Sequence, residues 1–294
     1  MMLNQQGNPV QLGFIGIGPM GGKMSRWLMQ AGYPMMIADI DQAKLDAIEK
    51  EGARVTRSNA ELVGQCDVVL TSLPLSEVWV DVAEKELVPN ARPGQIFIDM
   101  GTVTPPETRR VEKLFRARGA HLIDSPVSNG GSGTAKLHIF IGGEKEIVDK
   151  VWPLYEIMGY PDRYDYVGPS GCGQVVKGVN QLGIGLVNAA LLEILSMAVN
   201  CGVDPQAVRK VVCVQGADNW RGCMYRMCDT VSAGEAKNVV VKHGQLTHYL
   251  KEAEADGFSL PLTRALYDYL KDVPETIRDA NRRSPSMWDE LTHK

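Results

Sequence analysis

One lysine inside a long apolar stretch is the residue of this chain whose setting best suits proton transfer. The stretch from about residue 174 to 200 contains no proline and consists mostly of Leu, Ile, Val, Ala and Met, which predicts one long helix. At about 100° per residue, four polar side chains share one stripe of this helix: Lys177, Asn180, Gln181 and Asn188. A lysine buried among apolar residues has a lowered pKa and can exchange a proton near neutral pH. The alternative is that Lys177 only extends its ammonium group from a helix end to water.

The helix that carries this stripe predicts how the chain is organised. About 26 helical residues extend for some 39 Å, which is longer than a small domain is wide. A helix that is apolar almost all round is buried or spans a membrane, and the polar stripe with Glu193 favours burial. We therefore expect the helix to join two domains, residues 1–168 and 169–294, and to be covered by a second copy of the chain in a homodimer or homotetramer.

Composition restricts the class of protein. The chain has 294 residues, enough for two domains, with 44% hydrophobic and 22% charged residues. A net charge of −4 without a basic run gives no electrostatic footprint for nucleic acid. The six cysteines form no CxxC pair and lack metal-ligand spacing, so we expect reduced thiols and no metal site. The first residues resemble no secretory signal, which predicts a cytoplasmic protein.

A glycine-rich turn near the amino terminus predicts a dinucleotide site. An apolar run at residues 10–17 is followed by a helical stretch at 22–31, and a second apolar run at 35–38 ends in Asp39. The glycines of a GxGxxG turn let the backbone approach a pyrophosphate, whose charge is met by the amides of the helix start. Between the first strand and the helix, the candidate cofactor-binding residues are Gly16, Ile17, Gly18, Pro19, Met20 and Gly21.

The residue pair at the end of the second strand predicts which cofactor is bound. Asp39 would accept hydrogen bonds from the ribose hydroxyls and would repel a 2′-phosphate. Ile40 follows, where an enzyme that prefers the phosphorylated cofactor would usually have an arginine. The pattern favours NAD over NADP.

Further strands and helices alternate along the first half, which predicts a parallel sheet of the Rossmann type. Ser58 and Thr104 are expected to cap two of the helices. Leu73, Pro74 and Thr102 follow strands, and ligands bind beyond the carboxyl ends of such strands, so these three are cofactor-pocket candidates unless they are ordinary loop residues. The expected strands after the second are residues 53–55, 68–72, 96–99, 121–124 and 138–141.

A loop of small residues at 125–133 predicts an anion site. Its hydroxyls and unhindered backbone N–H groups can hold a carboxylate, although a flexible linker has a similar composition. After the long helix, only helices are expected, at residues 205–214, 222–229, 239–255 and 262–273, followed by a polar tail from residue 274.

Three motifs in this order resemble the β-hydroxyacid dehydrogenase family: GFIGIGPMGGKMSRWLMQAG, DSPVSNGG and GCGQVVKGVNQ. The resemblance implies a Rossmann-type domain, an all-α second domain joined to it by the long helix, and dimers or tetramers formed through the helical part. It also implies residue roles. Lys177 would be the catalytic lysine, and Asn180 or Gln181 would orient the substrate. The substrate carboxylate would be held by Ser128, Asn129 and Gly130. Trp220 matches a common tryptophan of the family, and Lys242 matches a late lysine near the cofactor.

The departures from the family pattern concern the substrate side. Asn129 replaces the first glycine of the usual SGG, and Gly101 stands where serine is common. The late lysine is followed by His243 instead of aspartate. Because asparagine adds an amide that glycine lacks, we expect a substrate with an extra polar group near its carboxylate.

The predicted function is NAD(H)-dependent interconversion of a small β-hydroxy acid and its semialdehyde or keto acid, with Lys177 as general acid and base. One alternative is a dinucleotide-binding sensor without catalysis. Another is a related enzyme that reduces imines. Lys177 together with Asn180 favours the dehydrogenase over both. The expected partner is a small carboxylate-bearing substrate, with no nucleic acid, membrane or metal.

Overall fold

The computed structural model describes the chain except residues 1, 3–6, 8, 129–136, 280–281 and 293–294. Two compact units, residues 1–177 and 178–294, are each described by themselves. The division falls within the long helix, slightly later than the domain boundary expected from the sequence.

The first unit is built on a nine-stranded sheet. Six strands are parallel in the order β3-β2-β1-β4-β5-β6, and β8 then pairs antiparallel with β6 and β7 and parallel with β9. The strand order reverses direction between β1 and β4, which is where ligands bind in such sheets. The expected Rossmann-type fold is confirmed. The strands are β1 (Leu12–Ile15), β2 (Met35–Ala38), β3 (Arg54–Thr56), β4 (Val68–Thr71), β5 (Ile96–Asp99), β6 (His121–Asp124), β7 (Val127–Ser128), β8 (Leu137–Gly142) and β9 (Gly159–Gly168).

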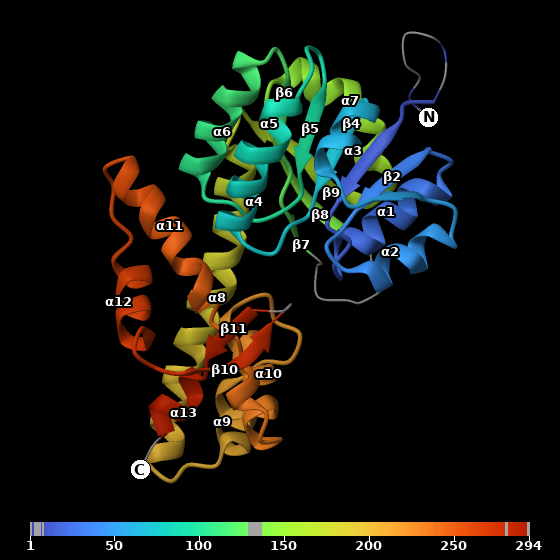
Figure 1. Cartoon of the computed structure of the whole chain (residues 1–294). Helices are drawn as coiled ribbons and strands as arrows, with labels where there is room; N and C mark the ends of the chain where they lie inside the picture. Colours follow the sequence, from blue (N-terminus) through green and yellow to red (C-terminus); the bar gives the residue numbers. More distant parts are fainter. Residues whose placement is uncertain (1, 3–6, 8, 129–136, 280–281, 293–294) are drawn as a thin grey trace. The chain divides into compact units, whose positions relative to one another are not determined.

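Helices cover both faces of this sheet and form two cores (Figure 1). On one face pack α1 (Gly21–Gln30), α2 (Gln42–Glu49) and α7 (Lys145–Met158). The other face carries α3 (Asn59–Gln65), α4 (Ser76–Val82) and α6 (Pro105–Ala117), with a π-helical turn, η1 (Ala83–Leu87), and α5 (Val88–Asn90) between the last two. Alternate residues of the strands enter the two cores, because successive side chains of a strand point to opposite faces.

The expected helix caps are present. The Ser58 side chain accepts a hydrogen bond from Glu61 N, and the Thr104 side chain accepts one from Glu107 N. Each bond satisfies an N–H group that the first turn of a helix leaves without a partner.

The second unit is rich in helices, as expected. It contains most of α8 (Cys172–Asn200), then α9 (Pro205–Val212), α10 (Trp220–Ser232), the 3₁₀ turn η2 (Ala236–Asn238), α11 (His243–Ala255) and α12 (Pro261–Leu270). A two-stranded hairpin of β10 (Glu275–Asp279) and β11 (Arg282–Pro285) precedes α13 (Met287–Thr292). The hairpin corrects the expectation that only helices follow the long helix, and α13 lies within the segment expected to be a polar tail. The helix expected from residue 239 begins only at His243, because the backbone is left-handed at Lys242.

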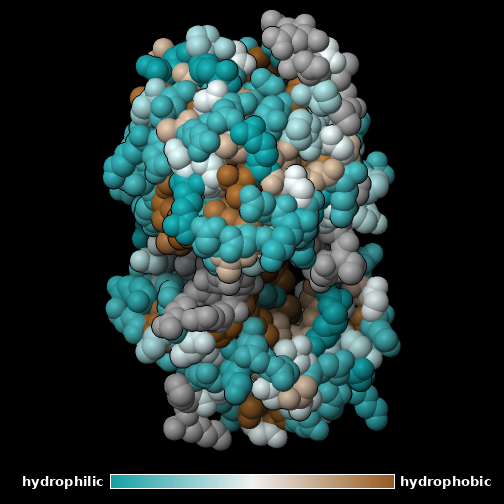
Figure 2. Space-filling view, turned by 45° about the vertical axis from the view of Figure 1, so that its right-hand side comes forward, coloured by the Kyte–Doolittle hydropathy of each residue, from teal (hydrophilic) through white to brown (hydrophobic). Residues whose placement is uncertain are grey.

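One side of the long helix is exposed in the single chain. Apolar side chains on one side of α8 are exposed, with Val179 at 68%, Ile194 at 50% and Met197 at 68%. Within the described residues, this helix alone is long and apolar enough to cross a membrane by length and composition, and 33% of its most apolar stretch is buried. Elsewhere, the face of the molecule in Figure 2 is mostly hydrophilic, with hydrophobic residues in small groups. The described residues of the chain therefore leave one side of α8 uncovered.

Candidate active site

The turn after β1 requires glycine at two positions and leaves a third open. Gly16 has φ +87°, and a Cβ there would meet Ser72 O at 2.7 Å. A Cβ on Gly21 would meet Gly16 O at 2.0 Å. A Cβ on Gly18 would have no described atom within 4 Å. The first two glycines thus build the turn, and Gly18 leaves space through which a ligand can approach the backbone.

The start of α1 suits the phosphates of a dinucleotide. The helix begins at Gly21, and the side chain of its N-cap residue, Met20, makes no capping hydrogen bond. Gly22 N donates to Gly18 O at 2.9 Å, so the turn and the helix are continuous. Pro19 is exposed and Met20 is half-buried at the same end. Helix N-termini attract anions through these amides and the helix dipole, so the residues present fit the pyrophosphate of NAD.

Asp39 joins the end of β2 to this turn. One carboxylate oxygen accepts a hydrogen bond from Ile17 N at 2.7 Å, and the other accepts from Asp41 N at 2.9 Å. Each carboxylate oxygen can accept a second bond, and Asp39 is only partly buried, so it can also receive ribose hydroxyls. Ile40 beside it is fully exposed. The described geometry fits the role expected from the sequence.

The loops after β1, β4 and β5 converge at one edge of the sheet. Leu73 lies against the turn, since a Cβ on Gly16 would be 2.9 Å from its side chain. Its carbonyl oxygen would be 3.4 Å from a Cβ on Gly101, so the loop with Thr102 lies next to it. Pro74 is exposed, and Thr102 is half-buried. The structure thus brings these three cofactor-pocket candidates to the edge that holds the glycine turn.

A pair of buried aspartates under this edge has no counterpart among the expected site residues. Asp99 and Asp124 are paired in register at the ends of β5 and β6. The Asp99 carboxylate accepts hydrogen bonds from Thr71 Oγ1 and from Gly101 N, both at 3.0 Å, while its Oδ2 makes none among the described residues. Burial raises the pKa of Asp99 to about 7, and the pKa of Asp124 is likewise raised to about 7 by burial. Sequence position alone, at the ends of two buried strands, was the only available signal.

Asp124 fixes the beginning of α8. Its two carboxylate oxygens accept hydrogen bonds from Gly171 N at 2.8 Å and from Gln174 N at 3.0 Å. Gly173 must be glycine, because a Cβ there would meet Phe140 O at 2.4 Å. A carboxylate at a helix N-terminus satisfies N–H groups that the helix leaves open. The first turn of α8 is therefore anchored directly on the sheet.

Lys177 follows within the next turn of α8 and is 6% exposed. Its Nζ donates a hydrogen bond to Val127 O at 2.7 Å, next to Ser128 on β7. This short strand is held by β8 and by the preceding Ser125, whose hydroxyl lies 2.7 Å from Tyr155 Oη. The structure thus brings together Lys177 and Ser128, two residues expected in the site. Asn129 and Gly130, the next expected anion-binding residues, lie outside the described residues.

In the second unit, the polar stripe of α8 continues as a chain of amides. Asn180 Nδ2 donates to Gln181 Oε1 at 2.9 Å, and Gln181 Nε2 donates to Gln245 Oε1 on α11. Gln181 is 5% exposed, whereas Asn180 is half-buried, so Asn180 is the more accessible of the two. Asn188 Nδ2 donates to Val240 O at 3.0 Å, which gives this residue a structural role.

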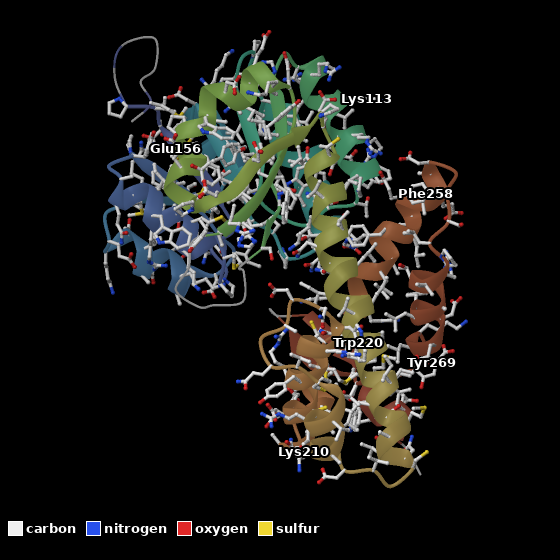
Figure 3. All side chains as sticks on the ribbon, turned by 180° about the vertical axis from the view of Figure 1, so that it is seen from behind. Lys113, Glu156, Lys210, Trp220, Phe258 and Tyr269 are labelled. Atoms are coloured by element: carbon white, nitrogen blue, oxygen red, sulfur yellow. The ribbon has the colours of Figure 1, made fainter. Side chains whose placement is uncertain are left out.

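Two further candidates also belong to the second unit. Lys242 has φ 59°, a left-handed backbone that is uncommon for a residue with a Cβ. It lies close to α8, where a Cβ on Gly185 would meet Val241 O at 2.6 Å. Trp220 begins α10 and is 51% exposed (Figure 3). The Arg221 guanidinium carbon lies 5.6 Å from the centre of its ring. Among the described residues, no group of three or more His, Cys, Asp or Glu is placed to hold a metal ion.

Comparisons with known proteins agree with this geometry. Residues 11–168 match the family described as the NAD binding domain of 6-phosphogluconate dehydrogenase. The NAD-dependent L-serine dehydrogenase of Pseudomonas aeruginosa is 31% identical over 216 residues, 71% of each chain. The 2-(hydroxymethyl)glutarate dehydrogenase of Eubacterium barkeri is 30% identical over 207 residues, 69% of this chain and 68% of that protein.

Solved structures show the same fold. The 3-hydroxyisobutyrate dehydrogenase of Mycobacterium tuberculosis, solved with L-serine, has a TM-score of 0.76 at 26% identity and covers 90% of this chain and 94% of its own. An imine reductase of Bacillus cereus has a TM-score of 0.62 at 18% identity, covering 89% and 92%, and shares the fold. The glycine turn, the sheet order and the sequence relatives agree. The chain is an NAD-binding oxidoreductase and belongs to the β-hydroxyacid dehydrogenase family.

Proposed function

We propose that this protein oxidises or reduces a small β-hydroxy acid with NAD(H), using Lys177 as the general acid and base. The observation that carries the proposal is the placement of Lys177. Its amine is buried, lies 2.7 Å from Val127 O beside Ser128, and is one turn from the helix start that Asp124 anchors. A general base must lie within hydrogen-bond reach of the proton that it removes, and the fixed position of this amine beside Ser128 supports that role.

The proposed reaction transfers one hydride and one proton. When bound, the nicotinamide exchanges the hydride at its C4 carbon. In oxidation, neutral Lys177 takes the hydroxyl proton of the substrate through Nζ; in reduction, its ammonium returns a proton to the carbonyl oxygen. Ser128 supplies a hydroxyl that can donate to the substrate carboxylate, and Asn180 supplies an amide that can orient the substrate. Such positioning converts a bimolecular step into an effectively unimolecular one.

The names of the relatives support one class of substrate. Serine, 3-hydroxyisobutyrate and 2-(hydroxymethyl)glutarate all carry a hydroxymethyl group on the carbon that bears the carboxylate. We therefore propose a 3-hydroxypropanoate with a substituent at carbon 2, which oxidation converts into the corresponding semialdehyde. Asn129, where the family usually has glycine, favours a polar substituent at that carbon.

A substrate panel tests this function. The purified protein is mixed with NAD and one acid at a time (L-serine, glycerate, 3-hydroxyisobutyrate, 3-hydroxypropionate or 2-(hydroxymethyl)glutarate), and reduced nicotinamide is followed by its absorbance. We expect turnover with at least one, and faster turnover with serine or glycerate than with 3-hydroxyisobutyrate. NAD binding without turnover of any acid or semialdehyde would support a sensor instead. If 3-hydroxyisobutyrate is turned over fastest, the proposed effect of Asn129 on substrate choice is refuted, whereas the dehydrogenase function is not.

We also propose that the exposed side of α8 is covered by a second copy of the chain. This apolar face consists of Val179, Val187, Ile194 and Met197, each about half exposed or more. A helix that spans a bilayer presents apolar residues all round, whereas the opposite side of α8 buries Lys177 and Gln181. A face of this kind on a protein in water marks an interaction surface.

Light scattering measures this association directly. The unmodified protein should be a dimer or tetramer at micromolar concentration, and Val187→Lys should shift it towards the monomer. Val211→Lys is the matched control, because Val211 is a valine that is 78% exposed on another helix, α9. A monomeric unmodified protein would contradict the proposal.

A further inference from the structure

A fully buried glutamine links the first turn of α8 to the loop after β5. Gln174 Nε2 donates a hydrogen bond to Gly101 O at 3.0 Å, and its Oε1 accepts one from Val103 N at 3.2 Å. The side chain is 0% exposed. Both bonds go to backbone groups on either side of Thr102, so one amide holds the whole loop.

The two ends of this link are themselves fixed to the sheet. Gln174 N donates to the Asp124 carboxylate at the end of β6, and Gly101 N donates to the Asp99 carboxylate at the end of β5. The loop also donates from Thr104 N to Ser76 Oγ at 3.2 Å. The loop that carries Thr102 and the start of α8 therefore form one hydrogen-bonded assembly at the ligand-binding edge.

Lys177 follows Gln174 by three residues, which is about 4.5 Å along the helix axis. We infer that Gln174 is a positioning residue that sets the distance between the Gly101–Val103 loop, on the cofactor side, and the amine of Lys177. This inference rests on the proposed role of Lys177. A shift of about 1 Å between reacting groups can lower a rate about 100-fold, so a link of this kind affects the chemical step even though it touches no reacting atom.

A second buried glutamine provides a matched control with the same chemistry. Gln95 Nε2 donates to Val63 O at 2.8 Å and to Cys66 O at 2.9 Å, and its Oε1 accepts from Arg92 N at 3.0 Å. It is 4% exposed and immediately precedes β5, so it lies at the amino end of the strand whose carboxyl end carries Asp99 and the Gly101–Val103 loop. Replacing either Gln174 or Gln95 therefore removes hydrogen bonds to backbone groups, but only Gln174 lies beside the proposed site.

The experiment compares Gln174→Met and Gln95→Met, which remove the amide and keep the side-chain length. Both variants should melt at a lower temperature than the unmodified protein. Gln174→Met should lower kcat roughly 10- to 100-fold, with NAD affinity changed less than about fivefold and a larger deuterium isotope effect from substrate labelled at the hydroxymethyl carbon. Gln95→Met should leave kcat and the isotope effect unchanged.

A second variant covers the case in which Gln174→Met does not fold. Gln174→Glu keeps the acceptor for Val103 N, and only its protonated form can donate to Gly101 O. Because position 174 is fully buried, desolvation favours the protonated form of a carboxyl there. Its kcat relative to the unmodified protein should therefore rise as the pH falls.

Two results would overturn the inference. One is a Gln174→Met kcat within threefold of the unmodified protein while Lys177→Met is inactive. The other is an equal loss of kcat in the Gln174 and Gln95 variants. If Lys177→Met itself keeps its activity, the proposed function fails, which separates the two claims.

Discussion

Replacement of Gly18 by alanine should separate cofactor binding from folding. A Cβ at this position has no described atom within 4 Å, and its φ is outside the left-handed region, so the variant should fold and melt close to the unmodified protein. The methyl group would occupy the space through which the pyrophosphate approaches the turn. The loss of one hydrogen bond to a charged group costs about 1.5–3 kcal/mol, which weakens NAD binding roughly 10- to 150-fold.

Two further glycines give the contrast that this prediction needs. Gly64→Ala, at an exposed position of α3, should raise helix stability by up to about 1 kcal/mol and leave NAD affinity unchanged. Gly21→Ala should impair both folding and binding, because its Cβ would lie 2.0 Å from Gly16 O. NAD affinity is measured by titration and stability by thermal melting. Unchanged NAD affinity in a folded Gly18→Ala variant would refute the placement of the pyrophosphate on this turn.

Two other predictions concern carboxylates at the ends of the strands. NAD(H) should support turnover better than NADP(H), and Asp39→Ala should reduce the difference in kcat/KM between the two cofactors. The same variant should lower the free energy of unfolding by about 1–3 kcal/mol, since Ile17 N and Asp41 N lose their acceptor. Equal kcat/KM for both cofactors in the unmodified protein would exclude a role of Asp39 in cofactor choice. Burial raises the pKa of Asp99 to about 7, so the folded state binds the carboxyl proton more tightly than the unfolded chain does. The free energy of unfolding therefore falls as the pH rises from about 4 towards 7, where the folded protein must give up this proton. Asp99→Asn keeps the accepting oxygen but cannot ionise. It should increase the free energy of unfolding by up to ~4 kcal/mol at pH 8 and by less at pH 5, as measured by chemical denaturation. A gain that does not change with pH would contradict burial as the cause of the raised pKa.

The elements that the sequence could predict are those with strong local signals. The apolar runs at β2, β5 and β6 were located to the residue, and the caps at Ser58 and Thr104 were identified because a cap depends only on neighbouring residues. Strand β9 was missed. It contains proline and charged residues, and much of it is exposed at the sheet edge, so it lacks the apolar alternation of a strand. The β10–β11 hairpin was missed for a similar reason, since both strands are polar.

The candidate site shows the same limit. The glycine turn and Asp39 could be located from spacing, because a dinucleotide imposes that spacing on one continuous segment. The anchor of α8 on Asp124 and the link from Gln174 to Gly101 join residues far apart in the chain. No local pattern indicates such contacts, and they depend on which strand ends the fold places together. The apolar composition of the long helix did predict that it needs cover beyond its own chain, but which of its residues are exposed depends on the packing of the other helices.

The most direct test of the account is the turnover of Lys177→Met beside the unmodified protein, with the best acid of the panel and NAD affinity measured on the same samples. The account predicts a kcat lower by roughly 10²–10⁴-fold, because methionine cannot take up or return the substrate proton. NAD affinity should stay within about threefold, since the pyrophosphate is expected at the Gly16–Gly21 turn and not at Lys177. Lys177→Arg should not restore the rate, because arginine keeps its proton at working pH. Turnover by Lys177→Met within threefold of the unmodified protein would contradict the claim that Lys177 is the acid and base.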